Sequence, residues 1–367
     1  MAFPLLSHSR SDSPLLFLLD IGDSFMKSAQ IRQGKESLDI LSLSHKKTDA
    51  LSWKKDVERM RESAMAHYGK PDAVLLSFPP TIFRAKLVEY VLARKRSGPI
   101  SDREAKTLEK EMESKAEEDI KEYFSRVLGI TPAELVVPRV SVLERKANGY
   151  AIEDFRGIAA EQLLVRYLGT CIPRRYTDEI AGIPDVSLVH MAEGAARFFP
   201  GVRGDSAFID MGESMTHVAM VRQGTLLSFQ EFKGGAKYFT HYLERILGMQ
   251  DASARDLKER YAQGEFSQPL RAKLHSAFLR ESERWATLCV ETLCSGERVL
   301  GSRIFLSGGG SLLPEVQSVL REKLREALGE HVTISSFTPS LCAKNDKFPG
   351  SGNPLYTPML LLPYALK

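Results

Sequence analysis

The chain has no long apolar segment. No run of about 18 apolar residues occurs, which is the length that a membrane-spanning helix needs. Residues 1–20 contain a short apolar stretch, but no basic segment precedes it as in a secretory signal. We therefore expect a chain that is neither secreted nor membrane-spanning.

The chain also has little excess of charge of one sign. Its 50 lysines and arginines against 47 aspartates and glutamates give a formal net charge of +3. The basic residues are spread along the sequence and form no stripe of the kind that binds nucleic acid. We expect no nucleic-acid partner.

Cysteine is scarce. The four cysteines lie far apart except for Cys289 and Cys294, and no histidine stands near them at zinc-ligand spacing. This pattern indicates reduced thiols in a cytosolic protein. The rest of the composition, 43% hydrophobic and 26% charged over 367 residues, allows two domains or one elaborated fold.

The first half of the chain alternates strand and helix patterns. A helix predicted over 101–129 opens with a capping box of Ser101 and Glu104, ends at Gly129, and carries mixed charges that indicate a solvated surface. The other predicted elements are a hairpin over 15–31, a strand over 37–45, a helix over 56–69, a strand over 72–78 and two strands within 133–154. The stretch from about 80 to 176 is expected to form a small α+β insertion.

The second half repeats the pattern of the first. Residues 204–232 again predict strand, acidic glycine turn, strand and a third strand, which implies an internal duplication. Helices are expected over 238–300, and residues 302–324 predict a buried strand, three glycines and a helix. The apolar segment at 355–366 is expected to be a last core strand.

The first acidic turn has the composition of a phosphate site. Gly22, Asp23 and Ser24 can present backbone N–H groups to an anion, Ser24 adds a hydroxyl and Lys27 adds a positive charge. Asp20, just before the turn, can hold Mg²⁺ through its water ligands. One such turn is a weak signal, because ordinary hairpins have the same composition.

A second copy and a third glycine segment strengthen the signal. Asp210, Gly212, Ser214 and Thr216 correspond to the first turn, so two hairpins from two lobes are expected to hold one polyphosphate between them. The glycines at 308–310 (Gly308, Gly309 and Gly310) follow a strand and precede a helix, leaving room for a base or ribose against bare backbone.

In order and spacing, these elements resemble the phosphate-1, phosphate-2 and adenosine motifs of the actin, heat-shock-chaperone and sugar-kinase superfamily. The similar segments are DIGDSFMKSAQI (20–31), FIDMGESMTHVAMVRQGTLLSFQEFKGGAKYFT (208–240) and IFLSGGGSLLPEV (304–316). Within the superfamily the chain is most similar to the bacterial FtsA and PilM families, and ANGYAIEDFRG (147–157) is similar to FtsA in particular.

The resemblance implies an α/β fold class, namely the two-lobed actin-like (ribonuclease H-like) ATPase fold with a small α+β insertion of the SHS2 type in the first lobe. It implies ATP and Mg²⁺ as cofactors, with Asp20 and Asp210 near the metal and Gly235 and Lys258 near the nucleotide. The implied organisation is a first lobe over 1–78, the insertion over 79–176, a connection over 177–203, the second lobe over 204–340 and a return segment over 341–367.

The chain departs from the FtsA pattern at several positions. Glu213 adds a carboxylate beside the second turn, which repels phosphate unless a cation or solvent intervenes. His217 stands in the place of an aspartate, and we expect a partly exposed structural histidine there rather than a general base. Ala254 and Arg255 replace the usual Ala-Glu pair ahead of Lys258. Glu193 is the candidate for positioning a hydrolytic water, with a structural role on a helix surface as the favoured alternative.

The function implied is an ATP-binding FtsA-like scaffold that forms filaments or dimers and links the cell-division machinery, through the tail of a tubulin-like protein, to the inner face of the membrane. ATP turnover is expected to be slow or absent. The alternative is a PilM-like adaptor for type IV pilus assembly, which binds a membrane protein's short N-terminal peptide; a small-molecule kinase is less favoured. FtsA ends in an amphipathic membrane helix that this sequence lacks, so membrane contact is expected to be indirect or to need a missing segment.

Overall fold

Two sheets of the same topology form the two lobes of the computed structural model, which describes residues 13–35, 37–48, 53–95, 97–198, 205–223, 225–295, 303–329, 332–343 and 350–366. The first sheet has the order β10-β4-β1-β2-β3 and the second the order β13-β12-β11-β14-β15. Each sheet combines an antiparallel three-stranded hairpin unit with two further parallel strands. The internal duplication predicted from the two hairpins is confirmed by this topology.

The elements of the first lobe agree with the predicted pattern. The central strands β1 and β4 are apolar and almost fully buried on both faces, as expected for inner strands covered on both sides. The elements are β1 (Leu15–Ile21), β2 (Phe25–Gln33), β3 (Leu38–Lys47), α1 (Trp53–Tyr68), β4 (Ala73–Ser77), β10 (Val186–Leu188) and α4 (Met191–Phe198).

The second lobe packs its helices against one face of its sheet. Trp285, Phe239 and Leu320 are among the buried side chains that join these helices to the strands. The elements are β11 (Ser206–Met211), β12 (Met215–Arg222), β13 (Thr225–Lys233), α5 (Lys237–Leu247), α6 (Asp251–Ala262), α7 (Gln268–Cys294), β14 (Arg303–Ser307), a 3₁₀ turn (Gly309–Leu312), α8 (Pro314–Leu328), β15 (Thr333–Ser336) and a 3₁₀ turn (Pro339–Leu341).

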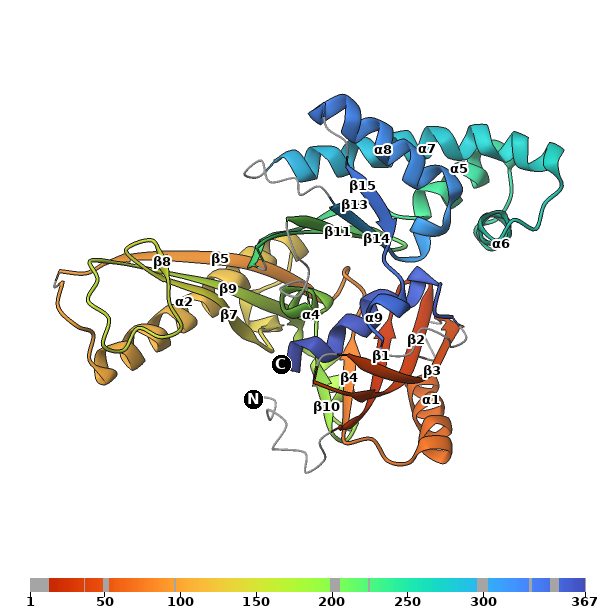
Figure 1. Ribbon diagram of the computed structural model, residues 1–367. Helices are drawn as coiled ribbons and strands as arrows, with labels where there is room; N and C mark the ends of the chain where they lie inside the picture. Colours follow the sequence, from red (N-terminus) through yellow and green to blue (C-terminus); the bar gives the residue numbers. More distant parts are fainter. Residues whose placement is uncertain are drawn as a thin grey trace.

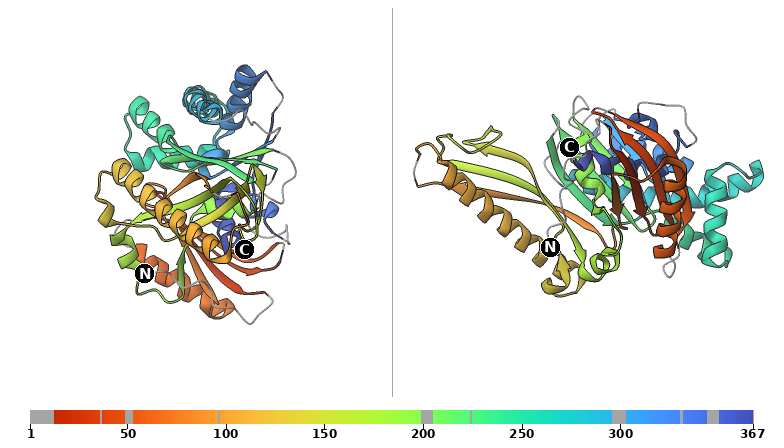
Figure 2. Two further views of the ribbon diagram at one scale, coloured as in Figure 1. Left: turned by 90° about the vertical axis from the view of Figure 1, so that its left-hand side faces the viewer. Right: turned by 90° about the horizontal axis from the view of Figure 1, so that it is seen from below.

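A third sheet, of order β5-β9-β7-β8, lies between β4 and β10 in the sequence and extends away from both lobes (Figures 1 and 2). Helix α2 packs on one face of it. Ser101 accepts the N–H of Glu104 at its start and Gly129 ends it with φ +68°, as predicted, but the Glu104 carboxylate pairs with Arg94, so only one half of the predicted capping box is present. The elements are β5 (Arg84–Ala93), α2 (Asp102–Leu128), a 3₁₀ turn (Pro132–Glu134), β6 (Leu135–Val136), β7 (Val140–Ala147), β8 (Tyr150–Ala151), β9 (Gln162–Pro173) and α3 (Arg174–Ile180).

The C-terminal segment is helical, so the core strand predicted at 355–366 is wrong. A 3₁₀ turn (Pro354–Tyr356), α9 (Thr357–Leu361) and a second 3₁₀ turn (Leu362–Leu366) return from the second lobe and pack on β1, β2 and α4 (Figure 1). Pro358 suits the first turn of a helix, and burial on all sides removes the polar face that would have shown helical periodicity.

Helices α4 and α9 join the lobes and cross at Gly194. A Cβ atom at this position would lie 1.9 Å from the carbonyl oxygen of Leu361, so glycine is required for the two backbones to approach. One hydrophobic core, with Leu16, Phe208 and Leu360 among its residues, continues from the first lobe through these helices into the second.

The cysteines are free, as predicted: Cys171, Cys289 and Cys342 are buried and Cys294 is exposed. Burial raises the pKa of the Cys171 thiol to about 12, which keeps it protonated. Among the described residues, no helix is at once long enough and apolar enough to cross a bilayer.

Candidate nucleotide-binding site

A cavity of about 730 Å³ lies between the two lobes, and the three glycine segments meet there. The predicted site residues that line it are Asp20, Gly22, Asp23, Ser24, Lys27, Asp210, Gly212, Lys258, Gly308, Gly309 and Gly310. The structure thus brings most of the predicted site together from β1, β11, β14 and α6.

The turn between β1 and β2 is stabilised by Thr48, the residue that follows β3. The N–H of Gly22 donates to the carbonyl of Phe25 at 2.9 Å, and Thr48 donates through its backbone N–H to Ser24 and through its hydroxyl to Gly22, both at 2.8 Å. The N–H groups of Asp23 and Ser24 donate to no oxygen of the described residues. They remain available to an anion.

The turn between β11 and β12 is supported by the start of α5. The N–H of Gly212 donates to Met215, while the carbonyls of Gly212 and Glu213 accept the N–H groups of Ala236 and Lys237 at 2.9 and 2.8 Å. Gly235 packs behind the turn, where a Cβ would lie 2.4 Å from the carbonyl oxygen of Glu213. Gly235 therefore shapes this turn without lining the cavity.

Each lobe pairs its cleft carboxylate with a cation from the facing strand. Asp20 is opposite Lys27 in the β1–β2 register and forms an ion pair with it. Asp210 is opposite His217 in the β11–β12 register, with 3.6 Å between the carboxylate oxygen and Nδ1. His217 is thus the second-lobe counterpart of Lys27, seven residues after its aspartate in each case.

His217 is buried, so the partly exposed position predicted for it is wrong. Burial alone would lower its pKa, but the carboxylates of Asp210 and Glu231, each 3.6 Å from a ring nitrogen, outweigh that effect and raise the pKa to about 9. The imidazole is therefore a cation at neutral pH. Glu231 also pairs with Arg84 of β5, which connects this cluster to the third sheet.

A second histidine beside it is neutral. His190 has its ring centroid 5.8 Å from that of His217, and burial together with the neighbouring charge lowers its pKa. Its Nδ1 accepts the N–H of Ala192 at 3.1 Å, which requires an unprotonated nitrogen. His190 lines the cavity, and the sequence had given no signal for it.

The triple glycine allows β14 to end against β11. Gly308 has φ +86°, and a Cβ there would lie 2.5 Å from Oδ1 of Asp210. The hydroxyl of Ser307 donates to that same carboxylate at 3.2 Å. Asp210 is opposite Ser307 in the parallel register, as Asp20 is opposite Ser77, so the duplication extends to this serine.

Two further predicted residues lie outside the cavity lining. The side chain of Thr216 faces the helices on the other side of the sheet, where it donates to the carbonyl of Gly234 and accepts from Nε1 of Trp285. Side chains alternate between the faces of a strand, so Thr216 and His217 cannot both face the cleft. Ser214 accepts the N–H of Gly234 with its backbone carbonyl and does not line the cavity.

Glu193 lies in the first turn of α4, and its side chain is buried. Its carboxylate accepts the N–H of His190 at 2.8 Å and lies 3.4 Å from Nε of Arg139. Together with the bond from the N–H of Ala192 to His190, this contact caps the first turn of α4. Its side chain is 3% exposed, so the predicted helix-surface position is wrong. It does not line the cavity, and the water-positioning role stays a prediction.

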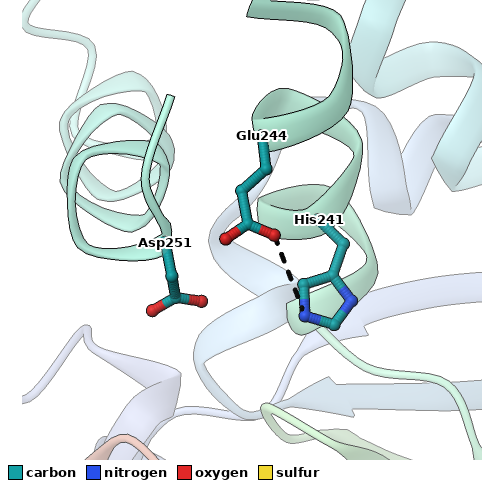
Figure 3. Close-up of side chains that lie close together, drawn as sticks. All are labelled: His241, Glu244 and Asp251. Atoms are coloured by element: carbon teal, nitrogen blue, oxygen red, sulfur yellow. Dashed lines mark ion pairs between the residues drawn. The ribbon is translucent and has the colours of Figure 1, made fainter. Parts of the chain in front are cut away.

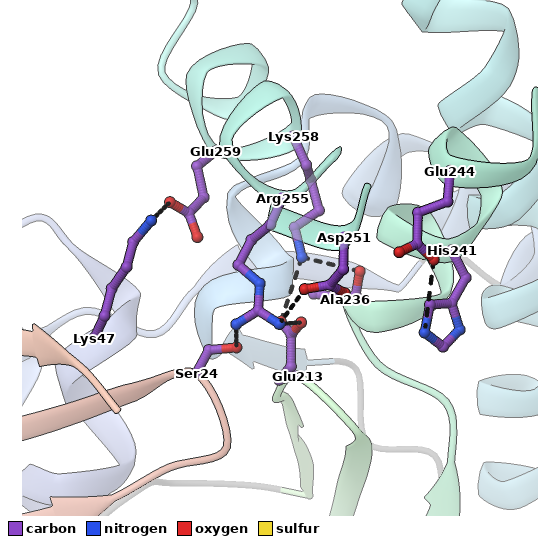
Figure 4. Close-up of polar contacts among 10 residues, drawn as sticks. All are labelled: Ser24, Lys47, Glu213, Ala236, His241, Glu244, Asp251, Arg255, Lys258 and Glu259. Carbon is purple, nitrogen blue, oxygen red and sulfur yellow. Dashed lines mark hydrogen bonds and ion pairs between the residues drawn. The ribbon is translucent and has the colours of Figure 1, made fainter. Parts of the chain in front are cut away.

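Glu213 is neutralised by cations of α6. Nζ of Lys258 lies 3.3 Å from its carboxylate and also donates to the carbonyl of Ala236, while Nη2 of Arg255 lies 3.9 Å away (Figure 4). Burial lowers the pKa of Lys258, and the charge of Glu213 opposes that shift. The positive charges of Lys258 and Arg255 therefore offset the repulsion that was predicted between Glu213 and phosphate. The cavity wall also includes Lys46, Lys47 and Glu259, which the sequence did not indicate.

The residues present fit a nucleotide with Mg²⁺. Gly22 cannot carry a side chain, because a Cβ would lie 2.8 Å from the carbonyl of Phe25, so bare backbone is exposed where phosphate is expected. Asp20 and Asp210 supply one carboxylate from each lobe, with 13% and 11% of their side chains exposed, and oxygen ligands suit a Mg²⁺ ion that keeps its waters.

A second group of possible metal ligands lies on α5 and at the start of α6. Ligand atoms of His241, Glu244 and Asp251 lie within 4.8 Å of one another (Figure 3). His241 is 52% exposed, and Asp251 is bound to Arg255 at 3.1 Å. Since Asp251 already has a cation partner, we assign this group no metal.

The fold is that of the actin-like ATPases, as predicted. The chain is similar to PilM of a PilM–PilN type IV pilus biogenesis complex, with a TM-score of 0.64, 15% identity and coverage of 98% of this chain and 100% of that one. It is also similar to the ethanolamine utilization protein EutJ from Carboxydothermus hydrogenoformans (TM-score 0.50, 12% identity, 98% and 90% covered) and to a diol dehydratase-reactivating factor (TM-score 0.50, 10% identity, 95% and 99% covered). No family model matches the sequence, and no curated protein matches it.

Proposed function

We propose that this protein is an ATP-binding, actin-like scaffold that binds ATP and Mg²⁺ between its two lobes. The observation that carries the proposal is the meeting of three glycine segments, two of them at duplicated acidic hairpins, at one cavity of about 730 Å³. Such a cavity can hold a polyphosphate between the hairpins and a base against the triple glycine.

Each part of the proposed site has a defined task. The free N–H groups at Asp23 and Ser24, with the Lys27 ammonium, bind phosphate oxygens. Asp20 and Asp210 orient the water ligands of Mg²⁺, and the bound ion neutralises phosphate charge. We propose that ATP acts mainly as a ligand that stabilises the closed lobes, with slow turnover or none.

We further propose a PilM-like role, in which the protein binds a short cytosolic peptide of a membrane protein at the inner face of the membrane. The full-length likeness to PilM, at a TM-score of 0.64, supports this role. The third sheet offers a surface for such a peptide: α2 covers one of its faces, while Val91 on β5 is 56% exposed and Tyr150 on β8 is 79% exposed.

The FtsA-like role, with filaments and a tubulin-like partner in cell division, stays the second candidate because the sequence motifs support it equally.

Sedimentation and peptide binding together distinguish the two roles. The purified chain is centrifuged with and without Mg²⁺-ATP, and binding of N-terminal peptides from membrane proteins of neighbouring genes is measured by fluorescence anisotropy. Peptide binding without pelleting supports the adaptor, whereas ATP-dependent pelleting supports the filament.

A further inference from the structure

Helix α6 of the second lobe contacts the first lobe with two side chains one turn apart. Nη1 of Arg255 lies 3.0 Å from Oγ of Ser24 in the β1–β2 turn, and a carboxylate oxygen of Glu259 lies 3.7 Å from Nζ of Lys47 at the end of β3 (Figure 4). Thr48, the residue after Lys47, donates its backbone N–H to the carbonyl of Ser24, so the two contacted segments are bonded to each other. Both contacts therefore act on the same corner of the first lobe.

The second lobe fixes the guanidinium of Arg255 in place. Nη2 is bound by Asp251, one turn earlier on α6, at 3.1 Å and lies 3.9 Å from Glu213 at the second acidic turn. Because Nη1 reaches Ser24, this one side chain spans both predicted phosphate turns. A planar guanidinium is suited to such simultaneous contacts.

Arg255 retains unused hydrogen-bonding capacity. Its Nε and the Oε1 atom of Glu213 are buried and, among the described residues, have no hydrogen-bond partner. Ser24 likewise keeps a donor, because a hydroxyl that accepts from Arg255 can still donate its own proton to a phosphate oxygen. The contact between Arg255 and Ser24 is thus compatible with a ligand at the same turn.

The lobes are covalently joined at a different place, through α4 and the segment that leads to α9 (Figure 1). A contact on α6 can therefore limit opening of the cleft about that connection. The distance between the β1–β2 turn and the β11–β12 turn decides whether one polyphosphate can contact both hairpins at once. Closing contacts of this kind raise affinity by removing the cost of ordering the lobes.

We propose that Arg255 is an interlobe latch, which holds the Ser24 turn and the Glu213 turn at their closed spacing and so sets the residence time of a polyphosphate in the cleft. The ligand class rests on the proposed function, but the latch itself is a property of the two lobes. Removing the guanidinium opens the cleft and lets the ligand leave faster.

The first test measures lobe spacing without nucleotide. Spin labels are attached after Glu62→Cys on α1 and Ser253→Cys on α6, both exposed positions, with Cys294→Ser to remove the exposed native thiol. Arg255→Ala is expected to lengthen or broaden the distance distribution measured by electron spin resonance. Arg260→Ala, which removes a half-exposed arginine of the same helix, is the matched control. Identical distributions in all three proteins would overturn the latch.

The second test measures ligand exchange with a fluorescent ATP analogue and Mg²⁺. Arg255→Ala is expected to raise the dissociation rate about tenfold, the effect of about 1.4 kcal/mol, while Arg260→Ala leaves it unchanged. Equal rates in the wild type and Arg255→Ala would overturn the latch while the proposed function stands. If the wild type binds no nucleotide at all, the proposed function fails, and the distance measurement still decides the latch.

Discussion

At the scale of single residues, the cleft is organised by two carboxylates, each paired with a cation seven positions later. Asp20 and Lys27 were each predicted from the sequence as part of a phosphate site, but the ion pair between them was not. The equal spacing of Asp210 and His217 was present in the sequence as well, and applying it would have identified His217 as the counterpart of Lys27. The burial of His217 could not be predicted, because it depends on Glu231 and His190, which reach it only in the folded protein.

The raised pKa of His217 predicts that stability falls at alkaline pH. An unfolded histidine titrates near 6.5, while the folded one titrates at about 9, so the folded state binds the proton more tightly. The resulting stabilisation is fully present below pH 6.5 and is lost as the pH rises through 9. Over this range we expect the free energy of unfolding, measured by urea denaturation, to decrease by up to about 3 kcal/mol.

The variant His217→Gln isolates this contribution. It removes the titrating group, so its free energy of unfolding is expected to change much less between pH 6.5 and 9 than that of the wild type. His190 cannot produce the same effect, because its lowered pKa costs stability only as the pH falls below 6.5. A wild-type profile that is flat from pH 6.5 to 9 would contradict a charged His217.

At the scale of elements, α4 was predicted from the sequence, but the contacts that cap it were not. A helix at the connection between the lobes was expected, and Glu193 was predicted either to position a water or to lie on the helix surface. The capping function of Glu193 depends on His190 and on Arg139, which comes from the segment of the third sheet. No local sequence pattern predicts that Arg139 lies beside Glu193. The long charged helix α2 was predicted almost to the residue because its end signals are local in the sequence. The C-terminal helix has no polar face and was mistaken for a strand.

Removing the cap of α4 is expected to destabilise the protein. Glu193→Ala leaves the buried N–H of His190 without an acceptor and Arg139 without its partner, at a cost of about 1–3 kcal/mol in the free energy of unfolding. Glu193→Gln retains an acceptor oxygen and is expected to lose less. Urea denaturation measures both, and equal stability of Glu193→Ala and the wild type would exclude the capping role.

The crossing of α4 and α9 makes a sharper prediction. Gly194→Ala places a Cβ within 1.9 Å of the Leu361 carbonyl oxygen, so the helices must separate, at a cost of about 3 kcal/mol or more. Gly182→Ala is the matched control, since a Cβ there meets nothing within 4 Å. The melting temperature should fall for the first variant alone; an unchanged value would mean that the helices cross less closely.

At the scale of the whole molecule, the duplication determines the site. Both sheets have the same strand order, so the carboxyl ends of β1 and β11 carry equivalent turns, and the connecting helices turn these ends toward one cavity. The sequence was sufficient to predict the two hairpins, the triple glycine and their convergence. It could not predict the α6 contacts, because the reach of Arg255 and Glu259 to the first lobe depends on how far the lobes are closed.

The central claim is that the cleft binds Mg²⁺-ATP through both acidic turns, and calorimetric titration tests it most directly. We expect the wild type to bind ATP with Mg²⁺ and both Asp20→Ala and Asp210→Ala to bind at least tenfold more weakly. Asp256→Ala, which removes an exposed aspartate of α6, should bind as the wild type does. Failure of the folded wild type to bind ATP, or unchanged binding by both cleft variants, would contradict ATP binding through the two turns.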